Sequence, residues 1–262
     1  MASKHKLSSR GWLALLALSV VLLGAGLGLF NFLTDPFGVF GDRVLGWWSY
    51  NETNNPRTAK FSYLEQHHEA YDSYIIGCSS TSSFPKEQLD EYFDASFYNL
   101  IMYGADMQDV EQYARYLIDH YTVKNLVLNV YEGYAQSYGF QNDSLTDAMP
   151  WQADGSSPIP FYARYLFANP RYGWEKLKKL GTDSMIQDVH DVFDVESGAY
   201  DKSRRDVEHI GSLDSYLAAY PEFLNYPRFD SRLTQMDQCL ESVAAIRDLC
   251  REAGVNFLVV TP

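Results

Sequence analysis

The fold of this chain is decided by residues 74–85, which read Tyr-Ile-Ile-Gly-Cys-Ser-Ser-Thr-Ser-Ser-Phe-Pro. A short apolar run that ends at Gly77 is typical of a buried strand in a parallel sheet. Pro85 is typical of the first turn of a helix, where its fixed φ fits and its missing N–H is not needed. The stretch therefore predicts a strand, a tight turn rich in hydroxyl groups, and a helix.

The serines of this turn have two interpretations. A serine there lies at the carboxyl end of a sheet, beside backbone N–H groups and a helix N-terminus, which makes Ser79 a candidate nucleophile. The alternative is a helix cap without chemistry, because Ser and Thr oxygens accept from the free N–H groups of a helix start. The preceding residues 75–78 also look like a bacterial lipoprotein box. We reject that interpretation because a lipidated cysteine must directly follow the apolar region of the signal. Cys78 lies far beyond that region, behind the polar run 65–73.

Outward from this stretch, strand patterns alternate with helix patterns. The predicted strands are 73–77, 96–100, 125–130 and 255–262, and the main predicted helices are 57–70, 85–93, 106–120 and 231–253. Such alternation predicts a three-layer α/β fold with a mostly parallel sheet flanked by helices. Ligands in these folds bind beyond the carboxyl ends of the strands. The Ser79 turn, the Gly104 loop and the loop 131–134 should therefore meet at one cleft.

Residues 134–230 interrupt this alternation with recurrent Tyr, Pro and Gly and with short predicted helices at about 160–168, 172–180 and 212–219. We expect an insertion that packs over the carboxyl edge of the sheet and adds no strand between the third and fourth strands. The last predicted strand runs to Pro262 with no helix after it. Because a βα unit is rarely left unfinished, we expect the C-terminal part of the domain to be missing from this sequence.

The N-terminus predicts a membrane anchor. Lys4, Lys6 and Arg10 precede an uncharged apolar segment, Gly11–Leu33, which as a helix is roughly 34 Å long against a hydrocarbon core of about 30 Å. The positive-inside rule places residues 1–10 in the cytoplasm and the bulk of the chain outside the cell membrane. Residues 34–70 then form a connector, and residues 71–262 form the α/β domain. A cleaved signal peptide is the alternative, but the segment is long and lacks a clear cleavage site.

Composition excludes some functions. The 262 residues carry a formal net charge of -13, so nucleic acid is not an expected partner, because phosphate binding needs clustered Lys and Arg. Cys239 and Cys250 lie in one predicted helix about 16 Å apart, too far for a disulfide bond. No zinc-site spacing and no Gly-rich phosphate loop is present, so no metal and no cofactor are expected.

Three motifs resemble those of the SGNH-hydrolase superfamily. They are Gly77-Cys78-Ser79, the run Tyr98-Asn99-Leu100-Ile101-Met102-Tyr103-Gly104 and the strand 124–130. The resemblance is to the membrane-anchored, envelope-facing branch that includes the lipoteichoic acid D-alanylation protein and the alginate O-acetylation proteins. It covers roughly half of the chain, from the apolar segment to the third strand, and excludes the insertion.

The resemblance implies roles for particular residues. Ser79 matches the nucleophile, Gly104 matches a glycine whose N–H helps to form the oxyanion hole, and Ser80 would contribute a second backbone N–H. The asparagine that the family carries after the third strand is absent or displaced, because residues 129–132 read Asn-Val-Tyr-Glu. The one Asp-x-x-His, Asp206 to His209, precedes the last helix and strand, so we expect the acid–base pair beyond Pro262 and keep Asp206 and His209 as the weaker alternative.

Two functions remain open. The resemblance implies an extracytoplasmic acyltransferase or esterase that modifies cell-envelope polysaccharide or teichoic acid. Its partners would be the bilayer, an envelope polymer and a membrane protein that donates the acyl group. The other function is a non-catalytic SGNH-like module that binds glycan or assembly partners, which Cys78 and the missing asparagine favour. Tyr131, Tyr134 and Tyr138 would then stack on sugars, although such residues also pack in cores.

Overall fold

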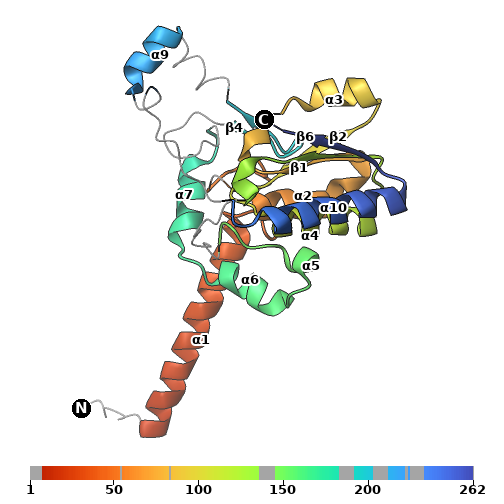
Figure 1. Cartoon of the computed structure of the whole chain (residues 1–262). Coiled ribbons are helices and arrows are strands. Elements are labelled where there is room, and N and C mark those ends of the chain that lie inside the picture. The colour runs from red at the N-terminus through yellow and green to blue at the C-terminus, as the bar shows by residue number, and fades with distance from the viewer. Residues whose placement is uncertain are drawn as a thin grey trace, which may run out of the picture.

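The computed structural model describes residues 8–53, 55–82, 84–135, 145–182, 192–202, 212–221, 224 and 233–261. At its centre is a parallel sheet of four strands in the order β2-β1-β3-β6 (Figure 1). Its strands are β1 (Ser73–Gly77), β2 (Phe97–Ile101), β3 (Asn125–Asn129) and β6 (Asn256–Val260). Every residue of β1, β2 and β3 is buried, as continuous apolar strands of a covered parallel sheet require.

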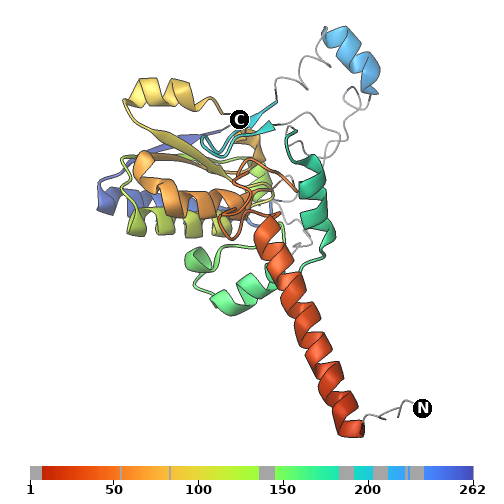
Figure 2. The same ribbon diagram turned by 180° about the vertical axis from the view of Figure 1, so that it is seen from behind.

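Helices cover both faces of the sheet, so the fold has three layers. One face carries α2 (Arg57–His67), α4 (Met107–His120) and α10 (Met236–Ala253), and the other carries α3 (Lys86–Phe93). Figures 1 and 2 show α3 alone on its side. The alternating side chains of the strands divide accordingly: Ile76 faces the larger helical layer and Ile75 packs with Leu89 and Phe93 of α3. The α/β class predicted from the sequence is confirmed.

The helices form where their apolar residues share one face. In α4 the side chain of Asp106 caps the helix by accepting from the N–H of Asp109 at 2.8 Å, which satisfies one of the free N–H groups of the first turn. Val110, Ala114 and Leu117 follow at helical spacing and are fully buried. α10 buries Cys239, Ser242, Ile246 and Cys250 in the same way and ends at Gly254, whose φ is +71°.

The observed boundaries differ from the predicted ones by small shifts, except at α10. That helix begins at Met236, five residues later than predicted, because the N–H of Gln235 bonds to the carbonyl oxygen of Ala135 instead of opening the helix. Cys239 and Cys250 are buried free thiols, as expected. Their burial raises the pKa of Cys239 and raises that of Cys250 to about 11.

The N-terminal helix α1 (Ser9–Thr34) projects away from the rest of the molecule in both views. It has 26 residues and is long and apolar enough to cross a membrane. Large apolar side chains such as Leu16 and Leu23 are more than half exposed along its length. The predicted segment 11–33 therefore lies inside this helix.

The last turn of α1 is packed into the domain. Asn31 donates two hydrogen bonds of 2.9 Å, to the carbonyl oxygens of Leu166 and Ala168. Both acceptors lie at the end of α6 (Pro158–Leu166) or just beyond it, and α7 (Arg171–Lys179) closes on the other side. Gly173 of α7 makes this approach possible, because a Cβ atom there would come within 2.4 Å of Thr34 Oγ1.

A buried charged cluster fixes the connector beyond α1. Asp35 accepts from the backbone N–H groups of Val39, Phe40 and Asp42 at 2.8 to 2.9 Å. Burial raises the pKa of its carboxyl group to about 6. Lys176 of α7 pairs with Asp42 at 3.0 Å and donates to the carbonyl oxygen of Asp35 at 2.8 Å. The connector loop that follows α1 is thereby folded around one lysine.

The aromatic residues of the connector pack under the domain. Trp48 contacts the ring of Tyr63 edge-on, with centroids 5.4 Å apart, and Tyr50 is buried beneath Lys176. The rings of Trp47 and Tyr50 are in contact, with their centroids 5.0 Å apart. These three aromatic side chains therefore take part in the packing of the domain.

The described part of the insertion adds no strand to the main sheet. It contains α5 (Trp151–Asp154), α6, α7, α9 (Leu213–Ala219) and a separate two-stranded antiparallel sheet, β4 (Val192–Phe193) and β5 (Tyr200–Asp201). The loop between β4 and β5 covers the outer edge of β2, where Ser197 accepts from the N–H of Asn99 at 2.8 Å. A sheet edge that would otherwise be unpaired is thus protected.

Candidate active site

The site is built on the turn that follows β1. Gly77 ends this strand with a φ of +144°, and its carbonyl oxygen accepts from the N–H of Met102 at 2.9 Å. A Cβ atom on Gly77 would lie 2.7 Å from the Cβ of Asn129 and 3.2 Å from its carbonyl oxygen. Only glycine suits this position, because both its backbone conformation and its contact with β3 exclude a side chain. The buried Cys78 follows, and then the 3₁₀ turn η2 (Ser79–Thr81).

The hydroxyl groups of the turn have different surroundings. Ser80 donates to Asn129 Oδ1 at 2.6 Å, and Thr81 donates to the carbonyl oxygen of Cys78 at 3.2 Å. Ser82 is buried and accepts from the Lys202 ammonium group. Ser79 is exposed, and no described residue hydrogen-bonds to its hydroxyl group. Among the described serines and threonines of the turn, Ser79 therefore presents the hydroxyl that is free to react.

These hydroxyl groups do not cap the helix that follows. The N-cap position of α3 is Pro85, and it carries no side-chain cap hydrogen bond. Ser80, Thr81 and Ser82 instead fix the turn itself, to β3, to its own backbone and to the segment after β5. The helix-cap interpretation is thus wrong for these three residues, while Ser83 lies outside the described residues.

Two neighbouring elements hold the turn in place from the β2 side. The side chain of Asn99, in the middle of β2, donates to the carbonyl oxygen of Thr81 at 2.9 Å. The N–H of Tyr200 donates to the carbonyl oxygen of Ser82 at 2.9 Å. Lys60 of α2 lies beneath, fully buried, and donates to the carbonyl oxygens of Asn99 and Ile101 at 3.2 and 3.1 Å. Burial lowers the pKa of Lys60 to about 7.

Gly104 lies on the adjacent loop. Gly77 and Ile101 are register partners in β1 and β2, so the loops after them leave the sheet side by side. The N–H of Ala105 bonds to the carbonyl oxygen of Met102 at 3.4 Å, and Gly104 in the third position of this turn has a φ of +66°. These are the features of a type II turn. Gly104 is exposed, and a Cβ atom on it would meet no other atom within 4 Å.

Asn129 is a residue of the site whose role the sequence interpretation missed. It ends β3, is buried, and contacts Ser80 through its side-chain oxygen, with Cys78 Sγ at 3.4 Å from the same oxygen. The available signal was a polar residue directly after the apolar run 126–128, at the edge where the other loops meet. An asparagine is therefore present at the end of the third strand, and it lies against the serine turn.

The described histidines lie at the other edge of the sheet. His67 ends α2, and His68 begins the short 3₁₀ turn (His68–Ala70) that precedes β1. His120 ends α4 before β3, so all three histidines lie near the amino ends of the strands. His68 stacks on Tyr121 with centroids 4.4 Å apart, and His120 stacks on Tyr116 at 4.2 Å. Asp206 and His209 fall outside the described residues. Within the described residues, no group of three or more His, Cys, Asp and Glu is placed to hold a metal ion.

The loop 131–134, the third loop expected at the cleft, is largely filled by its own aromatic side chains. Tyr134 is buried and meets Tyr131 edge-on with ring centroids 4.9 Å apart. Tyr138 falls outside the described residues. Tyr134 is therefore part of the core and offers no open ring face to a sugar.

The geometry thus brings Ser79, Ser80 and Gly104 to the carboxyl edge of one parallel sheet, together with Asn129. Comparison of the chain with protein-family models, with curated proteins and with solved structures found no match of any of the three kinds.

Proposed function

We propose that this protein is a membrane-anchored serine esterase or acyltransferase of the SGNH type. It would act outside the cytoplasm on cell-envelope polysaccharide or teichoic acid. The observation that supports the proposal is the exposed hydroxyl of Ser79, to which no described residue hydrogen-bonds. Ser79 lies two positions after a strand-ending glycine and beside the type II turn of Gly104. The resemblance of these segments to SGNH motifs supplies the substrate class.

The proposed chemistry follows from the residue types. The Ser79 oxygen would attack the carbonyl carbon of an acyl donor while a histidine accepts its proton. The oxyanion would be bound by the N–H groups of Ser79, Ser80 and Gly104, each such donor being worth about 3 kcal/mol of barrier. The histidine would then return the proton to the leaving group, leaving an acyl-serine. An envelope hydroxyl group or water would finally take the acyl group and regenerate Ser79.

A non-catalytic binding module is the second candidate, and one observation favours it. The three described histidines lie near the amino ends of the strands, on the opposite edge from Ser79. The catalytic proposal therefore needs its base from outside the described residues, and His209 is a candidate.

Ser79→Ala separates the two functions. We expect the full-length protein in its membrane to react with a serine-directed phosphonate probe, and Ser79→Ala to abolish the reaction. The variant should remain folded, because loss of an exposed hydroxyl group changes stability little. Ser82→Ala is the control: it removes a buried hydroxyl of the same turn and should still react. Reaction that persists in Ser79→Ala would overturn the assignment of the nucleophile.

The proposed location has its own test. Because Lys4, Lys6 and Arg10 precede the apolar helix, we expect residues 1–10 in the cytoplasm and the α/β domain outside. A reporter enzyme that is active only outside the cytoplasm, fused after residue 262, should be active. Activity of a cytoplasm-specific reporter at the same position would contradict the proposed orientation.

A further inference from the structure

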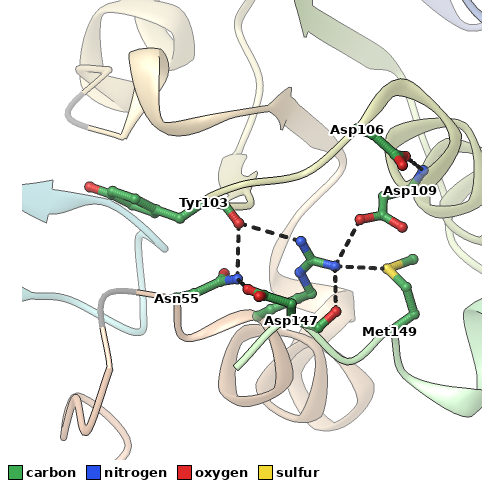
Figure 3. A network of polar contacts seen from close by, with 7 residues as sticks. Asn55, Tyr103, Asp106, Asp109, Asp147 and Met149 are labelled. Carbon is green, nitrogen blue, oxygen red and sulfur yellow. Dashed lines mark hydrogen bonds and ion pairs between the residues drawn. The ribbon is translucent and has the colours of Figure 1, made fainter. Parts of the chain in front are cut away.

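The peptide unit between Tyr103 and Gly104 is held from one side. Its carbonyl oxygen accepts from Asn55 Nδ2 at 2.9 Å and lies 3.4 Å from Arg57 Nη2, a longer and weaker contact (Figure 3). Both donors are buried, Asn55 being 4% and Arg57 1% exposed. They precede the glycine by nearly fifty positions in the chain, yet they converge on the turn that carries it.

The two donors are themselves anchored. Arg57 pairs with Asp109 of α4 at 2.9 Å and donates to the carbonyl oxygen of Asp147 at 2.9 Å. Asn55 donates to the side chain of Asp147, also at 2.9 Å. Figure 3 shows these groups gathered around the guanidinium group. Because the network joins the start of α2, the first turn of α4 and the segment before α5, it holds the donors at a fixed place under the Gly104 turn.

The direction of one N–H group follows from this contact. A peptide unit is planar, and no peptide bond in the described structure is cis, so its C=O and its N–H point in opposite directions. With the Tyr103 carbonyl turned toward Asn55 and Arg57, the N–H of Gly104 points away from them. Type I and type II turns differ mainly by a half-turn of this central peptide. Loss of the donors would therefore allow the peptide to reverse and the N–H to face inward.

We propose that Asn55 and Arg57 are positioning residues that keep the Gly104 N–H directed out of its turn and available to the oxyanion. The inference rests on the proposed function, because only a reaction at Ser79 gives the Gly104 N–H an oxyanion to bind. The donors also withdraw electron density from the carbonyl oxygen, and Arg57 adds a positive charge beneath it, so the same peptide becomes a better N–H donor.

The test uses two independent measurements. The first is the amide signal of Gly104 in protein that carries ¹³C at the tyrosine carbonyl and ¹⁵N in glycine. Only three glycines follow a tyrosine, namely Gly104, Gly139 and Gly173, so the spectrum of directly bonded pairs has three signals. The second is the rate constant for reaction of Ser79 with the phosphonate probe, because the phosphonyl oxygen carries developing negative charge.

Asn55→Leu removes the shorter hydrogen bond at similar side-chain volume. We expect the Gly104 amide proton to move upfield and the labelling rate to fall by about tenfold or more, as for a weakened oxyanion donor. Arg57→Met combined with Asp109→Leu removes the ion pair as a unit, and it should likewise move the Gly104 amide proton upfield and lower the labelling rate. Arg115→Met is the control: it breaks an exposed ion pair with Glu111 on the same helix and lies outside the network under Tyr103, so the signal and the rate should stay as in wild type. If Asn55→Leu fails to fold, Asn55→Ser provides the same test.

The outcomes separate the two proposals. If wild type reacts at Ser79 while folded Asn55→Leu keeps both the wild-type signal and the wild-type rate, the inference is wrong and the proposed function stands. If the Gly104 signal moves in the variants but wild-type protein never reacts, Asn55 and Arg57 do hold the peptide and the proposed function is wrong.

Discussion

Gly77→Ala is expected to lower the free energy of unfolding by about 3 kcal/mol or more. The φ of +144° at this position belongs to a region that residues with a Cβ atom avoid. The added carbon would also lie 2.7 Å from the Cβ of Asn129, and the neighbouring backbone of β3 cannot move without disturbing the centre of the sheet. Unfolding of the detergent-solubilised full-length protein in urea, followed by circular dichroism, measures the loss.

Gly104→Ala is the matched control for this prediction. It also places a Cβ on a residue with positive φ, +66°, but the added atom meets no other atom within 4 Å. We expect a loss of about 1–2 kcal/mol from backbone conformation alone. Equal losses for the two variants would show that the contact between Gly77 and Asn129 does not restrict this position.

Lys176→Met is the second change with a large expected effect, about 3–5 kcal/mol of lost stability. The substitution preserves the length of the side chain but removes the positive charge. Asp42 would then be buried without its cationic partner, and the carbonyl oxygen of Asp35 would lose a donor at 2.8 Å. Lys176 and Asp42 are both at most 1% exposed, so water cannot replace the lost ammonium group.

Two further variants show whether the ion pair is responsible. Lys178→Met, two positions away on α7, breaks a pair with Glu175 whose lysine is 54% exposed, and it should change the stability by less than about 0.5 kcal/mol. Adding Asp42→Leu to Lys176→Met removes the unpaired carboxylate and should recover much of the loss. A small effect of Lys176→Met in the same urea unfolding measurement would contradict the role given to this pair in fixing the connector beyond α1.

The sheet and its helices were predictable because their signals are local. Four apolar runs, each followed or preceded by a helix with one apolar face, define the order of the elements. The convergence of Ser79 and Gly104 then follows from the parallel direction of the strands alone. The β4–β5 sheet escaped prediction because strands of two residues are too short to show a period of two.

The partners of the site residues were less accessible to prediction. Asn129 meets Ser80 only because β1 and β3 pair in a register that the sequence does not state. Asn55 and Arg57 lie in a connector that the sequence describes only by its turn signals and by a helix pattern. Their contacts with Tyr103 span 48 and 46 positions and with Asp147 span 92 and 90, and no periodicity links residues at such separations.

The most direct test of the serine nucleophile is to locate the covalent adduct. Wild-type full-length protein in its membrane is treated with the phosphonate probe, digested, and analysed by tandem mass spectrometry of the peptide that contains residues 79–83. The mechanism predicts that the added mass lies on Ser79, with Ser80, Thr81, Ser82 and Ser83 unmodified. An adduct on any other residue, or no adduct on protein whose circular dichroism shows that it is folded, would contradict it.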